Sequence, residues 1–251
     1  MIISNLHKEP TALDTVVHRN LRLDNTVNAI SRLAPFTSFM ITLSEFAEAS
    51  REYPILFVRA APENGKDTVA PVAVFGLKPG ENLFLRGDQW LGSYLPAMIR
   101  AYPFTMARIE GSDRWAMVFD NSWEGLRLEQ GQALFNEKGE ATEFLNQVHR
   151  FVQEIENDVE RTRRACAELL EMNLLKPMRF DATLANGETL SVDGFMTIDD
   201  EAVVKLPDSE LARIYRSGLI HVLQTHHLSL GNMRRLLDRR LAQQGNGQAA
   251  A

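Results

Sequence analysis

The stretch of residues 142–173 constrains the fold more than any other part of this 251-residue chain. Its apolar side chains recur at steps of three and four, which is the spacing of one stripe along an α-helix. At a rise of 1.5 Å per residue such a helix is about 45 Å long, so it must either brace a sheet or reach a partner. The stripe consists of Phe144, Val148, Phe151, Ile155, Val159, Thr162, Cys166 and Leu169.

Two short segments earlier in the chain share one pattern, "REYP" at residues 51–54 and "RAYP" at residues 100–103. Each follows a short apolar stretch with helical spacing, and the residue before a proline is disfavoured in helical geometry. After each proline comes a strand-like run, a polar loop with glycine and a second strand-like run. We therefore expect a helix–strand–strand unit twice, either as a pseudo-symmetric pair or as two independent uses of a common junction.

Further strands and helices are expected on both sides of these segments. The run "DTVVHRNLRL" at residues 14–23 reads as a strand, and Asn186-Gly187 between two strand-like runs indicates a β-hairpin. Helical patterns cover residues 208–216 and 219–242. The predicted fold class is α+β: an N-terminal antiparallel or mixed sheet with short helices, then the long amphipathic helix, the β-hairpin and C-terminal helices.

This order of elements suggests a division of the chain. Residues 1–138 are expected to form a sheet-containing part with the two helix–strand–strand units. Residues 139–243 are expected to form the long helix, the hairpin and the C-terminal helices packed on it. The last residues, 244–251, have the composition of a disordered tail.

The charge balance and the N-terminus exclude several classes of protein. A formal net charge of -6 argues against a nucleic-acid binder, which usually needs a basic surface. No stretch approaches about 18 consecutive apolar residues, so we expect no membrane insertion. No secretory signal is recognisable and the single cysteine fits a reducing compartment, so the sequence favours a cytoplasmic protein.

The two tyrosine-proline pairs offer one candidate ligand site. If the two units are related by pseudo-symmetry, Tyr53 and Tyr102 could face a common cleft, with Arg51 and Arg100 near enough to receive an anionic group. Alternatively, each ring packs over its own helix end and each arginine is solvated.

Three of the six histidines fall close together in the predicted helix after residue 219. His221, His226 and His227 would point in three different directions on a helix, so no metal site is predicted there. His227 shares a face with Leu223 and is expected to be semi-buried. His18 and His227 remain as titratable groups for the ligand site.

Motifs of the common cofactor and catalytic sites are missing. The sequence contains no GxSxG, no GxxxxGK[ST] and no GxGxxG. No cofactor is therefore predicted, and an interaction protein is favoured over an enzyme.

The last predicted helix carries four arginines, at positions 234, 235, 239 and 240. Arg234, Arg235 and Arg239 are candidates for a protein-docking surface that meets an acidic partner. The alternative is a solvated helix face, with arginines near the C-terminal end where the helix dipole favours them.

Several segments together resemble the SapC family of bacterial proteins, over residues 17–239. They are "HRNLRL", "SEFAEASREYPILF", "GLKPGENLF", "LPAMIRAYPF", "FLNQVHRFVQEIENDVERTRRACAELLE" and "YRSGLIHVLQTHHLSLGNMRRL". The family takes its name from an association with the secretion and assembly of bacterial surface-layer protein. The resemblance therefore implies a link to surface-layer or secretion systems, and it assigns no catalytic residue.

Two functions follow as hypotheses. The first is a SapC-like accessory protein that binds another protein. The second is an enzyme or small-ligand binder whose site lies between the two helix–strand–strand units and the C-terminal helices, built from Tyr53, Tyr102, His18 or His227.

Overall fold

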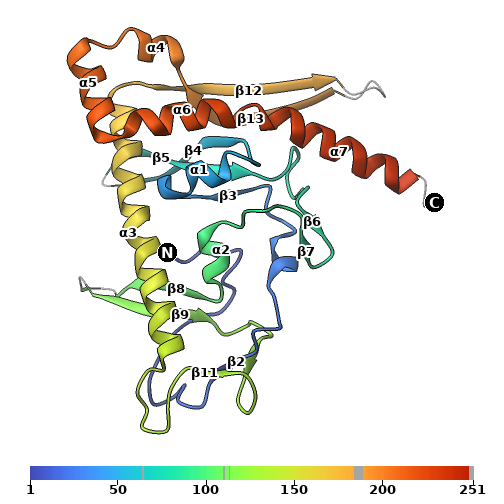
Figure 1. The fold of residues 1–251 in the computed structure, drawn as a ribbon, viewed down its shortest axis with the longest axis vertical. Coiled ribbons are helices and arrows are strands. Elements are labelled where there is room, and N and C mark those ends of the chain that lie inside the picture. The colour runs from blue at the N-terminus through green and yellow to red at the C-terminus, as the bar shows by residue number, and fades with distance from the viewer. Residues whose placement is uncertain (64, 110, 113, 184–188, 249–251) are drawn as a thin grey trace. The chain divides into compact units, whose positions relative to one another are not determined.

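The computed structural model describes residues 1–63, 65–109, 111–112, 114–183 and 189–248. The predicted α+β class is confirmed, because β-sheets combine with several helices (Figure 1). The chain forms two compact units, which are described separately. Unit 1 consists of Met1–Leu33, Leu85–Trp90 and Ala97–Asn157, and unit 2 of Ala34–Phe84, Leu91–Pro96 and Asp158–Ala251.

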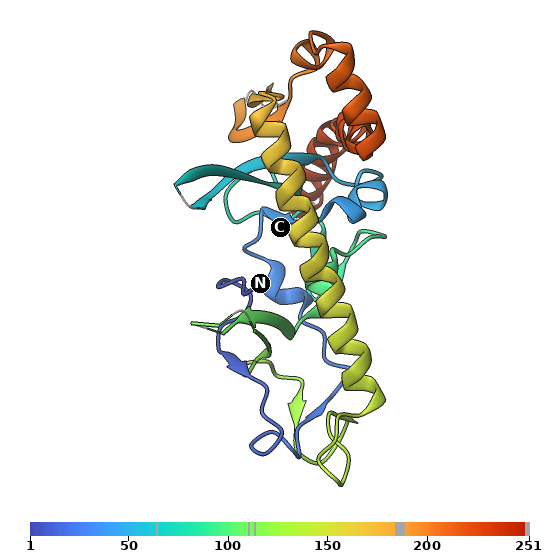
Figure 2. The same ribbon diagram turned by 90° about the vertical axis from the view of Figure 1, so that its left-hand side faces the viewer.

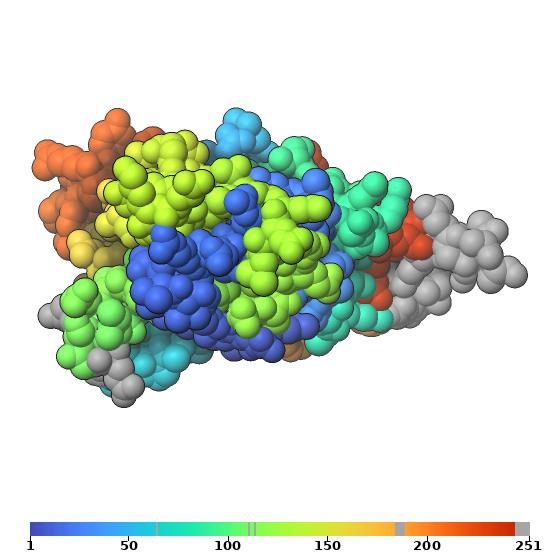
Figure 3. Space-filling model, turned by 90° about the horizontal axis from the view of Figure 1, so that it is seen from below, coloured from blue at the N-terminus to red at the C-terminus, as the bar shows by residue number. Residues whose placement is uncertain are grey.

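Unit 1 contains two small antiparallel sheets with the strand orders β1-β9-β8 and β10-β2-β11. Its strands are β1 (Pro10–Ala12), β2 (Arg22–Leu23), β8 (Phe104–Arg108), β9 (Trp115–Asp120), β10 (Leu126–Arg127) and β11 (Gln132–Ala133). Its other elements are η1 (Ile30–Leu33), the β6–β7 hairpin (Leu85–Arg86 and Gln89–Trp90) and α2 (Ala97–Ala101). Figure 3 shows the blue N-terminal stretch beside the yellow-green stretch with which it pairs.

Unit 2 is built on one five-stranded antiparallel sheet in the order β12-β13-β4-β5-β3. The strands are β3 (Ser38–Met40), β4 (Ile55–Glu63), β5 (Lys66–Val74), β12 (Leu175–Thr183) and β13 (Thr189–Ile198). Its helices are η2 (Leu43–Glu45), α1 (Phe46–Ala49), α4 (Asp200–Val204), α5 (Asp208–Ser217), α6 (Leu219–Ser229) and α7 (Asn232–Gln248). The first residues of β4 and the last residues of β5 form continuous apolar runs. They are buried, as expected of central strands.

The predicted long helix is α3 (Glu143–Glu171), unbroken over 29 residues (Figure 2). The hydroxyl of Thr142 accepts the Leu145 N–H at 3.3 Å before the first turn. Asn173 adopts a left-handed conformation, with φ 53°, just beyond the last turn. These two residues explain why the helix begins and ends where it does.

The buried stripe of α3 agrees with the prediction in its C-terminal half and differs in its N-terminal half. From residue 155 onward, Ile155, Val159, Thr162, Cys166 and Leu169 are all buried. Earlier in the helix the buried positions are Leu145 and Val152, whereas the predicted Phe144, Val148 and Phe151 are half-buried. The apolar face is therefore wider at the N-terminal end than a single stripe.

Both tyrosine-proline segments stand between a helix and a β-hairpin, as the sequence predicts. Tyr53-Pro54 lies between α1 and the β4–β5 hairpin in unit 2. Tyr102-Pro103 lies between α2 and the β8–β9 hairpin in unit 1. Each compact unit thus contains one helix–strand–strand copy. That the two copies arose as a pseudo-symmetric duplication stays a prediction.

The strand predicted over residues 14–23 is wrong except at its end, where β2 has two residues. The side chain of Asp14 accepts the N–H groups of Val16 and Val17, both at 2.8 Å. This local cap turns the chain and overrides the strand preference of the two valines.

The single helix predicted over residues 219–242 is also wrong, because the structure has α6 and α7 with a break at Leu230 and Gly231. The Ser229 hydroxyl donates to the His226 carbonyl at 2.6 Å at the end of α6. The side chain of Asn232 then binds carbonyls of the α1 region, which fixes where α7 begins.

The predicted hairpin after the long helix is present as β12 and β13, paired from Leu175↔Ile198 to Thr183↔Thr189. The Asn186-Gly187 turn itself lies outside the described residues. At the other end of the chain, α7 runs to Gln248, past the start of the predicted tail, and residues 249–251 lie outside the described part.

Candidate functional site

The first tyrosine-proline junction is part of the core of unit 2. Tyr53 is fully buried, and its hydroxyl donates to the backbone carbonyl of Tyr94. Its ring meets Phe75 and Phe84 edge to face, with centroid distances of 5.3 and 4.7 Å. These contacts fit a packing role with one hydrogen bond for the phenol.

Helix α7 caps the same junction. Asn232 Nδ2 donates to the carbonyls of Ser50, at 2.7 Å, and Tyr53, at 3.1 Å. Arg235 donates to the carbonyl of Arg51 at 3.2 Å. These are carbonyls at the end of a short helix, which need partners when they are covered. The exposed guanidinium of Arg51 pairs with Glu48 at 2.9 Å.

The second junction is organised around a buried carboxylate in unit 1. Tyr102 donates its hydroxyl to Asp120 Oδ2 at 2.7 Å, and Arg32 Nη1 lies 3.4 Å from the same oxygen. Asp120 Oδ1 accepts the Glu9 N–H at 2.9 Å and the Ser122 hydroxyl at 2.8 Å.

These contacts set the protonation states of Asp120 and Tyr102. Burial acts to raise the pKa of Asp120, but the hydrogen bonds from Tyr102, Glu9 and Ser122 outweigh it and lower that pKa to about 2. Burial, and then the bond to Asp120, raise the pKa of the Tyr102 phenol well above its usual value. The phenol therefore stays protonated and the carboxylate ionised at neutral pH.

The remaining predicted ligand residues have identifiable local contacts. The Arg100 guanidinium lies over the Phe151 ring at 5.2 Å. His18 Nδ1 accepts the Asp14 N–H at 2.9 Å, and its ring packs edge to face on Phe119 at 5.0 Å. His18 thus supports the turn that carries Val16 and Val17. The idea that Tyr53 and Tyr102 face one cleft concerns residues of different units and stays a prediction.

The arginines of α7 make contacts within unit 2. Arg239 lies over the ring of Phe84 at 4.3 Å, and Arg240 pairs with Glu81 at 2.6 Å in a largely buried position. Arg234 pairs with Asp238 one turn along the same helix, at 3.3 Å, and is well exposed. Of the three predicted docking residues, Arg234 and Arg235 are exposed, and Arg235 and Arg239 also contact the rest of unit 2.

A groove between α4 and α6 combines apolar side chains with a carboxylate–histidine pair, and the sequence analysis did not predict it. It has a volume of about 480 Å³, and its lining is mainly aliphatic. Its lining residues are Asp200, Val203, Ile220, Leu223, Gln224, His227 and Leu228. His227 Nδ1 lies 3.3 Å from Asp200 Oδ2 across the groove.

α6 carries apolar side chains on two faces, and within the described part of unit 2 the second face is only partly covered. Leu219, Val222 and Ser229 are buried with His226, and Figure 1 shows α6 running alongside the β12–β13 hairpin. The second face carries Ile220 and Leu228 into the groove, and Leu228 remains 74% exposed. The same face also carries the exposed polar side chains of Gln224 and His227, so Ile220 and Leu228 form only its apolar part.

The prediction that His227 is semi-buried is wrong, because His227 is exposed and His226 is the buried histidine. His226 falls on the face of Leu219, Val222 and Ser229, at steps of three and four. Its Nε2 lies 2.9 Å from the Thr197 hydroxyl and accepts the Ile198 N–H at 3.3 Å. The histidine is therefore an internal link between α6 and β13.

His226 predicts a pH dependence of stability. Burial lowers its pKa from 6.5 to about 4, so between these values the unfolded chain binds a proton that the folded chain does not. Folding stability should then fall as the pH drops from 6.5 towards 4, by up to about 3 kcal/mol from this group. Urea unfolding of the wild type and of His226→Gln at several pH values checks this. Equal pH slopes for the two proteins in this range would contradict it.

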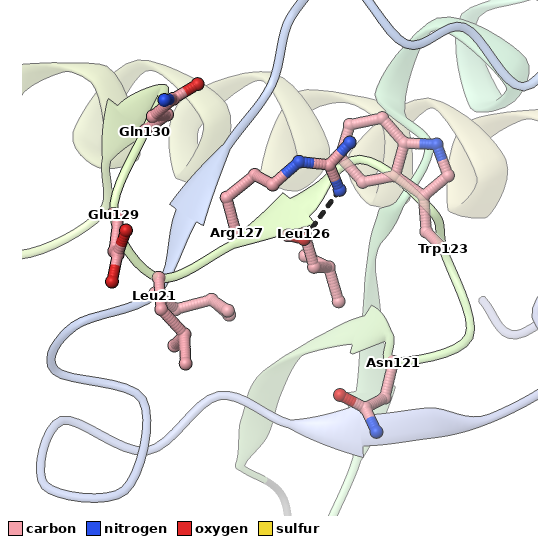
Figure 4. A pocket seen from close by; sticks show the side chains of 8 residues that line it. Leu21, Asn121, Trp123, Leu126, Arg127, Glu129 and Gln130 are labelled. Atoms are coloured by element: carbon pink, nitrogen blue, oxygen red, sulfur yellow. Dashed lines mark hydrogen bonds between the residues drawn. The ribbon is translucent and has the colours of Figure 1, made fainter.

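A second groove lies in unit 1, beside β10 and the loop that follows it (Figure 4). Its volume is about 580 Å³, and its walls include Leu21, Trp123, Leu126 and Leu128. Arg127 is held by the Leu126 carbonyl, which accepts from Nη1 at 2.9 Å, and by Asp24 at 3.5 Å. The Trp123 ring packs so closely on Gly125 that a Cβ there would lie 2.3 Å from it. Trp123 thus forms a fixed wall of this groove.

Within the described residues, no group of three or more His, Cys, Asp or Glu side chains is arranged to hold a metal ion. No helix in that part of the chain is both long and apolar enough to cross a membrane.

The fold and the grooves define an α+β protein whose C-terminal helices leave an apolar groove open. The model of the SapC family matches residues 13–236, and the chain therefore belongs to the SapC family. No curated protein and no solved structure matches the chain.

Proposed function

We propose that this SapC-family protein is a cytoplasmic accessory protein that binds another protein through the α4–α6 groove. The observation that carries the proposal is the second face of α6, whose apolar side chains Ile220 and Leu228 line the groove while Leu228 is 74% exposed. Family membership supports a partner that belongs to a bacterial surface-layer or secretion system.

The free energy gained by burying Leu228 favours a partner that covers it with apolar side chains. Fully burying a leucine side chain contributes about 1.5 to 3 kcal/mol, and Leu228 is 74% exposed. Exposed apolar residues that gather at a groove mark interaction sites, whereas isolated ones do not. Val203 and Leu223 line the same groove, so Leu228 does not stand alone.

The test is a substitution at the centre of the open face. Leu228→Glu should reduce recovery of the partner at least tenfold when the tagged protein is purified from its native bacterium, because a carboxylate would have to be buried in an apolar contact. The partner recovered with the wild type should be stoichiometric, and mass spectrometry should identify it as a surface-layer or secretion-system protein.

Ala167→Glu is the matched control for this experiment. Ala167 is exposed on α3 in the same unit, and the substitution introduces the same charge. The control should keep the partner. Equal recovery with Leu228→Glu and Ala167→Glu, or no stoichiometric partner with the wild type, would contradict the proposed function.

A further inference from the structure

We infer that the partner segment bound in the α4–α6 groove is an amphipathic helix with a lysine or arginine beside its apolar face. This inference rests on the proposed function and specifies what the groove recognises. It follows from the walls of the groove, from the spacing of its side chains and from the charges at one end.

The walls of the groove favour a helical occupant. Both walls are α-helices, α4 and α6, so the groove is not the edge of a sheet. A bound strand would find no row of backbone partners on such walls and would leave its own amides unpaired where it is covered. A helix satisfies its backbone internally. Among the described residues, no phenylalanine, tyrosine or tryptophan lines the groove, which disfavours a polyproline segment, because such segments dock on aromatic side chains.

The spacing of the open face matches a short helix. Ile220, Gln224, His227 and Leu228 follow one another at steps of four, three and one along α6. This stripe extends over about 12 Å of helix axis, which is a little more than two turns. A partner helix with apolar residues at positions i, i+4 and i+7 presents side chains over a similar length, about 10 Å.

The charges at one end of the groove favour a cation on the partner. Asp199, Asp200 and Glu201 are consecutive, at the start of α4. Lys176 pairs with Asp199 at 3.0 Å, and Lys205 approaches Glu201 at 3.8 Å. Asp200 instead points across the groove to His227 and is 67% exposed.

A lysine or arginine on a bound helix could reach Asp200 at the groove's edge. The partner's apolar face would then exclude water from the pair, and a partly desolvated pair is stronger than an exposed one. An acidic residue at the same place would be repelled by the carboxylate of Asp200, which lines the groove. The groove should therefore discriminate between partners by the sign of this one charge.

The inference is tested with synthetic helices and the full chain. Three fluorescent, hydrocarbon-stapled peptides share leucines at i, i+4 and i+7 and differ at one flanking position, which is lysine, alanine or glutamate. A fourth peptide has serine in place of the leucines. Fluorescence anisotropy should show the lysine peptide binding about tenfold more tightly than the glutamate peptide, and the serine peptide should not bind.

Charge-reversal variants of the protein test the charge preference more directly than the peptides alone. Asp200→Lys should reverse the order of the lysine and glutamate peptides, and Leu228→Glu should abolish binding of both. Asp208→Lys introduces the same charge change at an exposed position of α5 outside the groove lining, and it should preserve the order. An unchanged order with Asp200→Lys would overturn the inferred charge preference.

Failure of this inference can be distinguished from failure of the proposed function. If none of the peptides binds while Leu228→Glu still abolishes recovery of the cellular partner, the helical mode is wrong and the protein-binding function stands. If Leu228→Glu leaves that recovery unchanged, both the function and this inference are wrong.

Discussion

Replacing Asp120 with alanine should lower the free energy of unfolding by about 3 to 5 kcal/mol, because it removes one partner of a buried charged pair. Asp120 is completely buried and Arg32 is 14% exposed, so the guanidinium would remain largely covered without this carboxylate. The Tyr102 hydroxyl and the Glu9 N–H would lose their acceptor at the same time. Urea unfolding followed by circular dichroism measures the effect.

Glu154→Ala is the control for Asp120→Ala. Glu154 is an exposed carboxylate on α3 in the same unit, so its removal should change stability by less than about 0.5 kcal/mol. Similar unfolding midpoints for the two variants would show that the contacts of Asp120 contribute little. In that case the second tyrosine-proline junction would not depend on the carboxylate as described.

Gly76→Ala should destabilise the protein by about 3 kcal/mol or more, because the new Cβ would lie 2.1 Å from the carbonyl oxygen of Glu81. The Gly76–Phe84 loop cannot shift freely. The Leu77 N–H donates to Glu81 at 2.7 Å, and Arg240 holds the same carboxylate from α7. Moving the loop would therefore disturb the attachment of α7.

Gly80→Ala tests whether close packing, rather than loss of a glycine, causes the effect. A Cβ at Gly80 meets nothing within 4 Å, but φ is +73° there. The left-handed conformation should cost about 1 to 2 kcal/mol. Thermal and urea unfolding should therefore rank Gly76→Ala as the more destabilising change. The opposite ranking would show that the loop can relax around an alanine at position 76.

The long helix and the two tyrosine-proline junctions were predicted correctly from local spacing in the sequence. The long stripe predicts a helix over residues 142–173, and α3 covers Glu143–Glu171. The two tyrosine-proline segments predict a helix followed by two strands, and both copies have that order. In each case the periodicity and the proline act within a few residues of one another, so no distant contact is needed to decide the outcome.

Two predictions were wrong because side-chain hydrogen bonds, one local and one between distant residues, override the local propensity. Val16 and Val17 favour a strand, but the Asp14 carboxylate caps their amides and forms a turn. The break between α6 and α7 depends on Asn232, whose side chain reaches carbonyls of Ser50 and Tyr53 far away in the sequence. No pattern in the neighbouring residues contains that information.

The candidate groove was missed although a signal for it is present in the sequence. Ile220 and Leu228 lie on one face of the helix, while Leu219 and Val222 lie on another, so α6 carries apolar side chains on two sides. The location of the open face could not be predicted, because it depends on which face of α6 packs on the sheet and on the position of α4.

Site-specific photo-crosslinking in the native bacterium tests the central claim most directly. A photoreactive amino acid at position 228 should give one dominant crosslinked product, whose second component is the partner purified with the wild-type protein. The same amino acid at position 167, exposed on α3, should give no such product. A protein-binding groove between α4 and α6 is contradicted if position 228 gives no crosslinked protein, or if both positions give the same pattern.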